Sequence, residues 1–431
     1  MQEDSILGHV VLGHTAVINR DHDVVATRLT VFPDRRDAEP DAPALLQRLL
    51  AVWPAPPASD DEIQLTLRSV GDDGTTSPAA AVPVPSAAPS KATPLSLNIA
   101  SEPWLRAMLA ITPPPHIMIE VPAFMACDPA HTPALQALHA AGSALVIKGR
   151  PVSELPRELL PCFRHSLIDV GEDRRGNSPA PKGVVRTITH IQDGIRSRAE
   201  VQAAFDRGAV AVLGWPLDDE LQKSSAKSGG PDLQTVMALM QRVEREEPVD
   251  RLEAVLRNDP QLAFRLIRYL NSAAFGLAVE ISSFRHALMM LGYKKLKRWL
   301  ALLLASSSKD KAMKPVMQAS VRRGLLMEEL VRTSSDAEMR GEMFICGVFS
   351  LLDVLLGQPF AQLFKSVPVP ERVQQALVDG AGPFQPYMAL TRALESGSRA
   401  DISEAADACF IGLGEINAAL LRALAAAREL D

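Results

Sequence analysis

The segment that decides the fold of this chain reads VLRNDPQLAFRLIRYLNSAAFG from Val255 to Gly276, then ISSFRHALMMLGYKKLKRWLALLLASSS from Ile281 to Ser308. Asp259 is a good helix N-cap, and Pro260 suits the first helical position. Leucines then recur at helical spacing until Gly276, a residue type that readily ends a helix in the left-handed conformation. Apolar stripes continue on both sides of Gly292, so the segment predicts a compact all-helical bundle.

The same landmarks make this segment resemble the HDOD domain, a helical signalling module related to HD-type phosphohydrolases. The residues that carry the resemblance are Asp259, Pro260, Asn271, Ser272 and the Leu291-Gly292 pair. The related enzymes need His and Asp ligands for a metal that activates water. Here His286 is the only histidine after His190, and Leu352-Asp353 stands where such relatives carry an adjacent His-Asp pair. We therefore expect no metal in this half, and we expect Asp353 to cap a helix or pair with an arginine.

The first half alternates between strand-like and helix-like segments, which predicts a parallel sheet with helices outside it. The expected strands are LSLNIA, HIMIEVP, ALVIKG, HSLIDV, VVRTITHI and VAVLGWP, and the expected helices are PALQALHAAG and AEVQAAFDRGA. A Pro/Ala-rich insertion covers residues 71–94, and a polar, glycine-tipped linker covers residues 218–231. The chain should therefore combine an α/β domain over residues 1–217 with an all-α domain over residues 232–431.

With its opening strand pair from Ala16 to Phe32, the first half resembles the EAL domain, a TIM-like barrel that hydrolyses cyclic di-GMP with metal-bound water. The resemblance implies that the family's signature glutamate falls on Arg28 and that its paired aspartates fall on Lys148 and Gly149. The rest of the implied pocket keeps polar or acidic residues. The residues assigned to the pocket are Arg28, Asn98, Glu120, Lys148, Asp169 and Asp193.

The substitutions at Arg28 and Lys148 both make the implied pocket more positive. Hard divalent cations need several carboxylates, and each substitution replaces a negative ligand with a positive charge. We expect the two cations to pair with Glu120, Asp169 or Asp193, which would turn a metal cage into an internal ion-pair cluster. The alternative is that Asn98 and Glu120 are ordinary polar residues at strand ends, with no relation to a metal site.

Charge and composition limit the other functions. The net charge of −6 gives none of the basic excess that binding to a phosphate backbone needs, which argues against nucleic acid. Lys294, Lys295, Lys297 and Arg298 form a local basic run. This run suits either a docking patch for an acidic partner or an ordinary solvated helix face. No apolar stretch of about 18 residues, signal peptide or CxxC pair occurs, so we expect a cytoplasmic protein without a membrane span or zinc site.

Together these features predict a degenerate EAL-like barrel packed against an HDOD helical bundle, in a non-enzymatic bacterial signalling protein that needs no cofactor. Its partners should be other signalling proteins, and the barrel should restrict the surface that the bundle offers them. Two alternatives stay open. One is a catalytically inactive receptor for cyclic di-GMP that uses Arg28, Lys148 and Trp215. The other is an active cyclic di-GMP phosphodiesterase, which the lost ligands disfavour.

Overall fold

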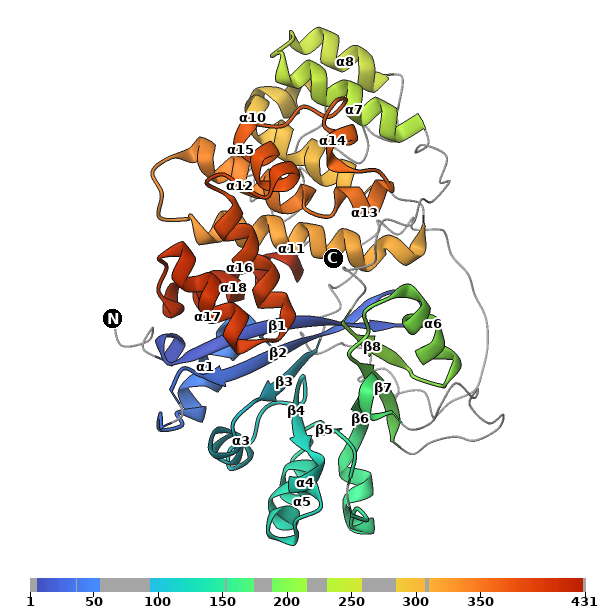
Figure 1. Ribbon diagram of the computed structural model, residues 1–431, viewed down its shortest axis with the longest axis vertical. Helices are drawn as coiled ribbons and strands as arrows, with labels where there is room; N and C mark the ends of the chain where they lie inside the picture. Colours follow the sequence, from blue (N-terminus) through green and yellow to red (C-terminus); the bar gives the residue numbers. More distant parts are fainter. Residues whose placement is uncertain are drawn as a thin grey trace, which may run out of the picture.

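The computed structural model describes residues 6–35, 37–54, 94–151, 153–173, 188–214, 231–257, 284–306 and 310–428. The residues up to 214, called the barrel part, form a closed eight-stranded barrel in which the strands follow one another in chain order (Figure 1). The strands are β1 (Val10–Asn19), β2 (Val24–Pro33), β3 (Leu95–Ile99), β4 (Ile117–Pro122), β5 (Leu145–Lys148), β6 (Phe163–Asp169), β7 (Thr189–Asp193) and β8 (Ala211–Leu213). The expected TIM-like architecture is therefore confirmed.

Strand β1 is the exception to the parallel order of this barrel. It runs antiparallel to both of its neighbours, β2 and β8, while every later pair from β2 to β8 is parallel. The expected opening hairpin is present, with Thr15 opposite Arg28. Because β2 to β8 all point the same way, their carboxyl ends gather on one rim of the barrel, where α/β proteins place their binding sites.

Helices cover the outside of the barrel, and apolar side chains fill its interior. The helices are α1 (Ala42–Val52), α3 (Glu102–Leu109), α4 (Ala123–Ala126), α5 (Thr132–Ala140) and α6 (Arg198–Asp206). Their starts are encoded locally. The Asp41 carboxylate accepts from the N–H of Ala44, and Ser197 with Glu200 forms a capping box. The interior cluster contains Val17, Ala26, Met118, Val146, Leu167, Ile191, Ala211 and Leu213.

From Pro231 onward the helical part begins, and the elements that the structure describes there are helical, as predicted. They are α7 (Pro231–Glu244), α8 (Val249–Arg257), α10 (Phe284–Ala305), α11 (Lys314–Leu330), α12 (Ala337–Phe349), α13 (Leu352–Leu356), α14 (Phe360–Leu363), α15 (Glu371–Gln374), a π-helical turn (Gln375–Asp379), α16 (Gln385–Ser396), α17 (Arg399–Cys409) and α18 (Leu413–Arg428). Helix α10 breaks at Gly292, where φ is 68° and ψ is 172°, so the predicted boundary between two helices falls there.

Some of the sequence predictions lie outside the described residues. They include Asp259, Pro260, Asn271 and Ser272, the insertion over residues 71–93, and the linker up to residue 230. The last residue of the expected linker, Pro231, already belongs to α7. Within the ranges that the structure describes, no single helix is long and apolar enough to cross a membrane. Among the described helices, the pair α17 and α18, bent by 106° at their junction, reaches that length and composition together.

The barrel part and the helical part pack against each other through the last three helices. Helices α16, α17 and α18 contact β1, and they lie beside it in Figure 1. The buried amide of Asn417 on α18 joins the two parts, because it accepts from the N–H of Leu12 at 3.1 Å and donates to the carbonyls of Leu7 and Val10 at 2.8 and 2.7 Å. The main hydrophobic core runs from the outer layer of the barrel into the helical part without a break. The expected packing of barrel on bundle is therefore present.

Two glycines allow helices α11 and α12 to approach each other closely. A Cβ on Gly347 of α12 would lie 2.4 Å from the Arg323 carbonyl oxygen and 2.6 Å from the Cα of Gly324, both on α11. These neighbours are backbone atoms, which cannot rotate away. Helices α11 and α12 therefore cross at a distance that only glycine allows here.

The buried cysteines of this chain are structural thiols. All four cysteines are free, with Cys162, Cys346 and Cys409 buried and Cys127 half-buried. Burial raises the pKa of Cys346 to about 12 and that of Cys409 to about 11. The thiols of Cys346 and Cys409 therefore stay protonated at neutral pH.

Candidate functional site at the barrel rim

The rim site is built by the alternation of side chains along each strand. Successive residues of a strand point to opposite faces, so the residue two positions after an interior one points inward again. Each of five interior residues is followed in this way by a charged one nearer the rim. The pairs are Ala26 and Arg28, Met118 and Glu120, Val146 and Lys148, Leu167 and Asp169, and Ile191 and Asp193.

Arg28 lies between two carboxylates of the rim. Its Nε and Nη2 donate to the two carboxylate oxygens of Glu120 at 2.8 and 2.7 Å, and its Nη1 donates to Asp193 Oδ2 at 3.1 Å. The Ser96 hydroxyl adds a hydrogen bond to Glu120 at 3.0 Å. Burial alone would lower the pKa of Arg28, but Glu120 and Asp193 outweigh it and raise that pKa above its usual value. The guanidinium is therefore a fixed positive charge within the rim.

Lys148 takes a different partner from the carboxylate that the sequence analysis assigned to it. Its Nζ donates to Asn98 Oδ1 at 2.9 Å, and the Asn98 amide nitrogen donates to the Thr30 hydroxyl at 3.2 Å. Burial lowers the pKa of Lys148, and the nearby charge of Arg28 lowers it further. The ammonium group is thus held by a neutral amide, while a second cation lies close to it.

Asp169 lines the same site without joining the ion pairs. Its Oδ1 accepts from the N–H of Gly171 at 2.7 Å. Gly194, with φ of 77°, passes so close that a Cβ there would lie 2.4 Å from Asp169 Oδ2. Of the three carboxylates expected to neutralise the rim cations, Glu120 and Asp193 do so in the described part of the chain, and Asp169 does not.

The arrangement of these residues does not fit a divalent metal ion. Both oxygens of Glu120 and one oxygen of Asp193 accept from Arg28, and the Asn98 oxygen accepts from Lys148. A hard cation would need these same oxygens, and it would lie beside two positive charges. Within the described ranges, no group of three or more His, Cys, Asp or Glu side chains is placed to hold a metal.

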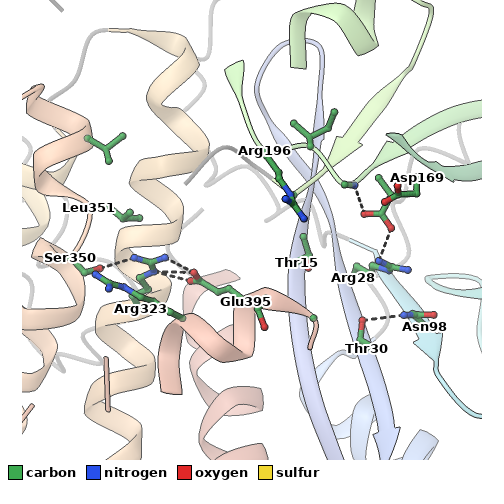
Figure 2. A pocket seen from close by; sticks show the side chains of 18 of the residues that line it. Thr15, Arg28, Thr30, Asn98, Asp169, Arg196, Arg323, Ser350, Leu351 and Glu395 are labelled. Atoms are coloured by element: carbon green, nitrogen blue, oxygen red, sulfur yellow. Dashed lines mark hydrogen bonds and ion pairs between the residues drawn. The ribbon is translucent and has the colours of Figure 1, made fainter. Parts of the chain in front are cut away.

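The rim opens onto a cavity of about 800 Å³ that lies between the barrel part and the helical part (Figure 2). The barrel part contributes rim residues together with Arg196 from the loop before α6. The helical part contributes residues from α11, α13, α14 and α16 and from the turn between α12 and α13. The charged residues of that second wall are Arg323, Asp353, Arg392 and Glu395.

The wall formed by the helical part has its own ion pair. Arg323 Nε donates to both carboxylate oxygens of Glu395, at 2.9 and 3.1 Å, and Arg323 Nη1 donates to the Ser350 hydroxyl at 3.2 Å. Asp353 Oδ1 accepts from the N–H of Val354 at 2.8 Å, in the first turn of α13. Burial raises the pKa of Asp353. The N-cap of α13 is Leu351, so Asp353 lies inside the first turn and bonds to the next N–H instead of capping the helix or pairing with an arginine, as the sequence analysis had expected.

The basic run on α10 divides into two pairs with different surroundings. Lys297 forms an ion pair with Glu244 at 2.9 Å. Arg298 pairs with Glu328 and lies over the Phe344 ring, with its Cζ 3.9 Å from the centroid. Lys294 and Lys295 are exposed. Only those two lysines are therefore free to form a docking patch.

Sequence reasoning missed the residues that the helical part brings to the cavity. Arg323, Arg392 and Glu395 belong to no motif, and they reach the rim only because α11 and α16 fold back onto the barrel. Sequence reasoning also did not identify His14 as a residue of the interface between the barrel part and the helical part. It is buried on β1 near Glu395, Arg322 and Arg323. No local pattern in the sequence marks any of these positions.

Comparison with known proteins identifies one domain in this chain. The model of the HDOD domain matches residues 231–361. The chain is 29% identical over 230 residues to "Uncharacterized protein YuxH" of Bacillus subtilis, covering 51% of this chain and 54% of that protein. It is 31% identical over 145 residues to "Cyclic di-GMP phosphodiesterase CdgJ" of Vibrio cholerae, covering 34% of each. The chain thus spans about half the length of one relative and a third of the other.

Solved structures with similar portions include EAL-containing proteins. One is "Vibrio cholerae LapD S helix-GGDEF-EAL (bound to c-di-GMP)", at 13% identity and a TM-score of 0.27, covering 50% of this chain and 54% of that one. Another is "PaMucR Phosphodiesterase, c-di-GMP complex", at 13% identity and a TM-score of 0.28, covering 50% and 93%. Scores this low assign nothing to this chain, whose barrel is defined by its own strand order. The chain carries an HDOD domain behind a closed, TIM-like eight-stranded barrel.

Proposed function

We propose that this chain is a non-enzymatic signal-transduction protein that acts through contacts with other proteins, in a pathway that uses cyclic di-GMP. The observation that carries the proposal is the position of Arg28, which bonds to Glu120 and Asp193 within the barrel rim. The similarity to a relative named as a cyclic di-GMP phosphodiesterase supports the pathway. The charges at the rim argue against the same chemistry in this chain.

The physical argument concerns the water that a phosphodiesterase must activate. A divalent metal lowers the pKa of its bound water and stabilises the developing negative charge. Here the carboxylates of Glu120 and Asp193 already neutralise the Arg28 guanidinium, and Lys148 lies beside it. A loss of hydrolysis leaves the fold intact, so the barrel retains its surfaces for contacts with partners.

Hydrolysis is tested directly with the full chain. The protein is incubated with cyclic di-GMP and either Mg²⁺ or Mn²⁺, and the linear product is separated by chromatography. An active EAL-domain phosphodiesterase assayed in parallel is the positive control. We expect no product above the protein-free blank. Turnover of about 1 per second or faster, an ordinary enzyme rate, would show that the proposal is wrong.

The proposed contacts with partners are tested by affinity capture from lysate of the source cells. The exposed pair Lys294 and Lys295 is reversed in charge in the K294E/K295E variant, and K365E alters an exposed lysine elsewhere in the helical part. A specific partner should be retained by the wild-type chain and by K365E, and an acidic partner should be lost with K294E/K295E. If the folded chain captures only proteins that a denatured sample also captures, the proposed role in contacts with other proteins is wrong.

A further inference from the structure

We propose that the groove between helices α16 and α17 is a docking site for a basic amphipathic helix of a partner protein. The groove has a volume of about 520 Å³, and it is lined by one face of each helix and by two residues that precede α16. It lies outside residues 231–361, which the model of the HDOD domain matches. This inference rests on the proposed function, because it names a surface and a class of partner for the contacts proposed there.

Short side chains give this groove its shape. The lining residues of α16 recur at helical spacing, as do those of α17, so each helix offers one continuous face. The two helices contact each other and lie side by side in Figure 1. Where the facing side chains are small, the ridge of a third helix can enter between two others. The alanines that line the groove are Ala376, Ala389, Ala393, Ala405 and Ala408.

Two large exposed apolar side chains lie next to the groove. Val378 is 36% exposed and stands in the chain between the lining residues Ala376 and Gly380. Phe410 is 96% exposed and follows the lining residue Ala408 by two positions, so their Cα atoms are at most about 7 Å apart. Exposed apolar side chains that extend an apolar groove mark a surface for contact with another molecule.

The backbone of Phe410 supports a role for its ring in binding. The residue ends α17 in the left-handed conformation, with φ of 55° and ψ of 33°, where glycine is the usual choice. A phenylalanine is strained in this conformation, and its exposed ring gains no packing that would offset the strain. Contact of the ring with a partner would supply the missing stabilisation.

The charges around the groove decide which kind of partner fits it. Among the described residues that line the groove, Arg392 is the one cation. A partner helix with lysine or arginine beside its apolar stripe would be attracted to the carboxylates here, whereas a second copy that presents the same face would be repelled. In the part of the chain that the structure describes, four exposed acidic residues in the groove or directly next to a lining residue form no ion pair. They are Asp379, Asp401, Glu404 and Asp407.

The test measures the binding of a designed helical peptide to the full chain by fluorescence anisotropy. The probe, about 18 residues long, carries a stripe of leucines at helical spacing with lysines beside it, and the control peptide has glutamate in place of each lysine. We expect saturable binding of the lysine peptide alone. E404K and A405L should each weaken that binding by about tenfold or more, the first by reversing a charge and the second by filling the groove.

Two matched variants control for net charge and for added apolar surface. E154K makes the same charge change at an exposed residue of the barrel part, and A400L adds the same side chain at an exposed position of α17 that does not line the groove. Each should keep the affinity for the lysine peptide within about threefold of the wild type, because salt screens distant charges. An effect of E154K as large as that of E404K would overturn the role of the groove charges.

F410G separates binding from folding at the end of α17. Glycine adopts the left-handed conformation without strain, so the midpoint of thermal unfolding should stay unchanged or rise. The affinity for the lysine peptide should fall by about threefold or more, because an exposed aromatic anchor is lost. Unchanged affinity in F410G would overturn the contribution of Phe410.

The remaining outcomes distinguish the occupants of the groove. Equal binding of the two peptides, or no binding of the lysine peptide, would overturn the inference, while the capture experiment would still decide the proposed function. Analytical ultracentrifugation of the full chain tests the other occupant. If the chain self-associates and A405L makes it monomeric, a second copy fills the groove and the inference is wrong.

Discussion

At the scale of single residues, Arg28 is held in the barrel by full pairing of its charge. Its side chain is 10% exposed, and that of Glu120 is 1% exposed, so neither can turn to water when the other is removed. A buried charge that loses its partner keeps the whole cost of its desolvation. Removing one partner of this ion pair should therefore destabilise the folded barrel.

The substitution R28M should lower the free energy of unfolding by about 3–5 kcal/mol, because it leaves the Glu120 carboxylate buried and uncompensated. R35M is the matched control. Arg35 also pairs with an aspartate, Asp37, but their side chains are 72% and 75% exposed, so the change should stay within about 0.5 kcal/mol. Urea denaturation followed by circular dichroism measures both. Equal effects of the two substitutions would contradict a role for the buried pair.

His14 should make stability depend on pH in the acidic range. Burial lowers its pKa from 6.5 to about 4, with Arg322 and Arg323 adding to the effect and Glu395 opposing it. Above pH 6.5 the ring is neutral in both states. Between pH 6.5 and 4 the unfolded chain binds a proton that the folded chain excludes, so the free energy of unfolding falls with falling pH. Below about pH 4 this loss levels off, at a total on the order of 3 kcal/mol.

The measurement is the midpoint of urea unfolding at a series of pH values from 7.5 to 4. H14Q should flatten the slope between pH 6.5 and 4, and H9Q, at an exposed histidine, should leave it unchanged. If the unfolding midpoint of H14Q depended on pH as steeply as that of the wild type, another group would be the cause of the acid sensitivity.

How far the sequence predicts this site differs from residue to residue. The residues gathered at the rim follow from strand alternation, which places Arg28, Glu120 and Asp193 on the inner face of the barrel, on β2, β4 and β7. Their detailed pairing does not follow, because the bonds from Lys148 to Asn98 and from Asn98 to Thr30 depend on the exact positions of three strands. Arg392 could not be assigned to the site at all, since its contact with the cavity depends on how two distant parts of the chain pack.

At the scale of elements, the crossing of α11 and α12 shows how much a missing side chain can matter. The backbone of α11 occupies the space that a side chain at position 347 of α12 would need. Gly341, six positions earlier on the same helix, has no other part of the molecule within 4 Å of an added Cβ. The close crossing of the two helices therefore requires glycine at position 347 but not at position 341.

G347A should lower the free energy of unfolding by about 1–3 kcal/mol, because the added methyl group forces α11 and α12 apart. G341A should raise it by up to about 1 kcal/mol, since alanine is the better helix former and meets no neighbour there. Thermal unfolding of both variants tests the prediction on one helix. If G347A proved as stable as G341A, the close crossing of the two helices would be wrong.

The elements themselves were largely predictable from local patterns. Each strand expected between residues 95 and 216 occurs, with β7 described from Thr189, because alternating or continuous apolar runs bounded by glycine and proline are strong strand signals. The helices that follow Pro370, in contrast, received no individual prediction. Their contacts with β1 link residues far apart in sequence, and such contacts leave no periodic signal in a single chain.

At the scale of the whole molecule, the interface at Asn417 should hold the two parts together without the linker. A protease site inserted between residues 218 and 230 allows the chain to be cut there. After cleavage we expect both fragments to elute as one species in gel filtration, because α16–α18 and β1 share a buried interface. Separate elution of the fragments would show that the linker alone keeps them together.

A second variant tests the residue that holds this interface. N417L leaves the Leu12 N–H and the carbonyls of Leu7 and Val10 buried without this partner, at about 1–3 kcal/mol for each lost bond. The cleaved N417L protein should therefore separate into its fragments. Q241L removes a side-chain bond to the Ser366 carbonyl within the helical part, and it should not affect the association.

The antiparallel β1 has a consequence for how this protein is made in the cell. The bond between Leu12 and Asn417 joins residues 405 positions apart, so the strand leaves the ribosome long before the helix that covers it. At about 5–20 residues per second, translation of the intervening chain takes roughly 20–80 s. Throughout that time Val10, Val11 and Leu12, which are fully buried in the finished molecule, have no cover from α16–α18. The nascent barrel is therefore a natural client for chaperones, and an early stop codon before position 417 would release a chain prone to aggregation.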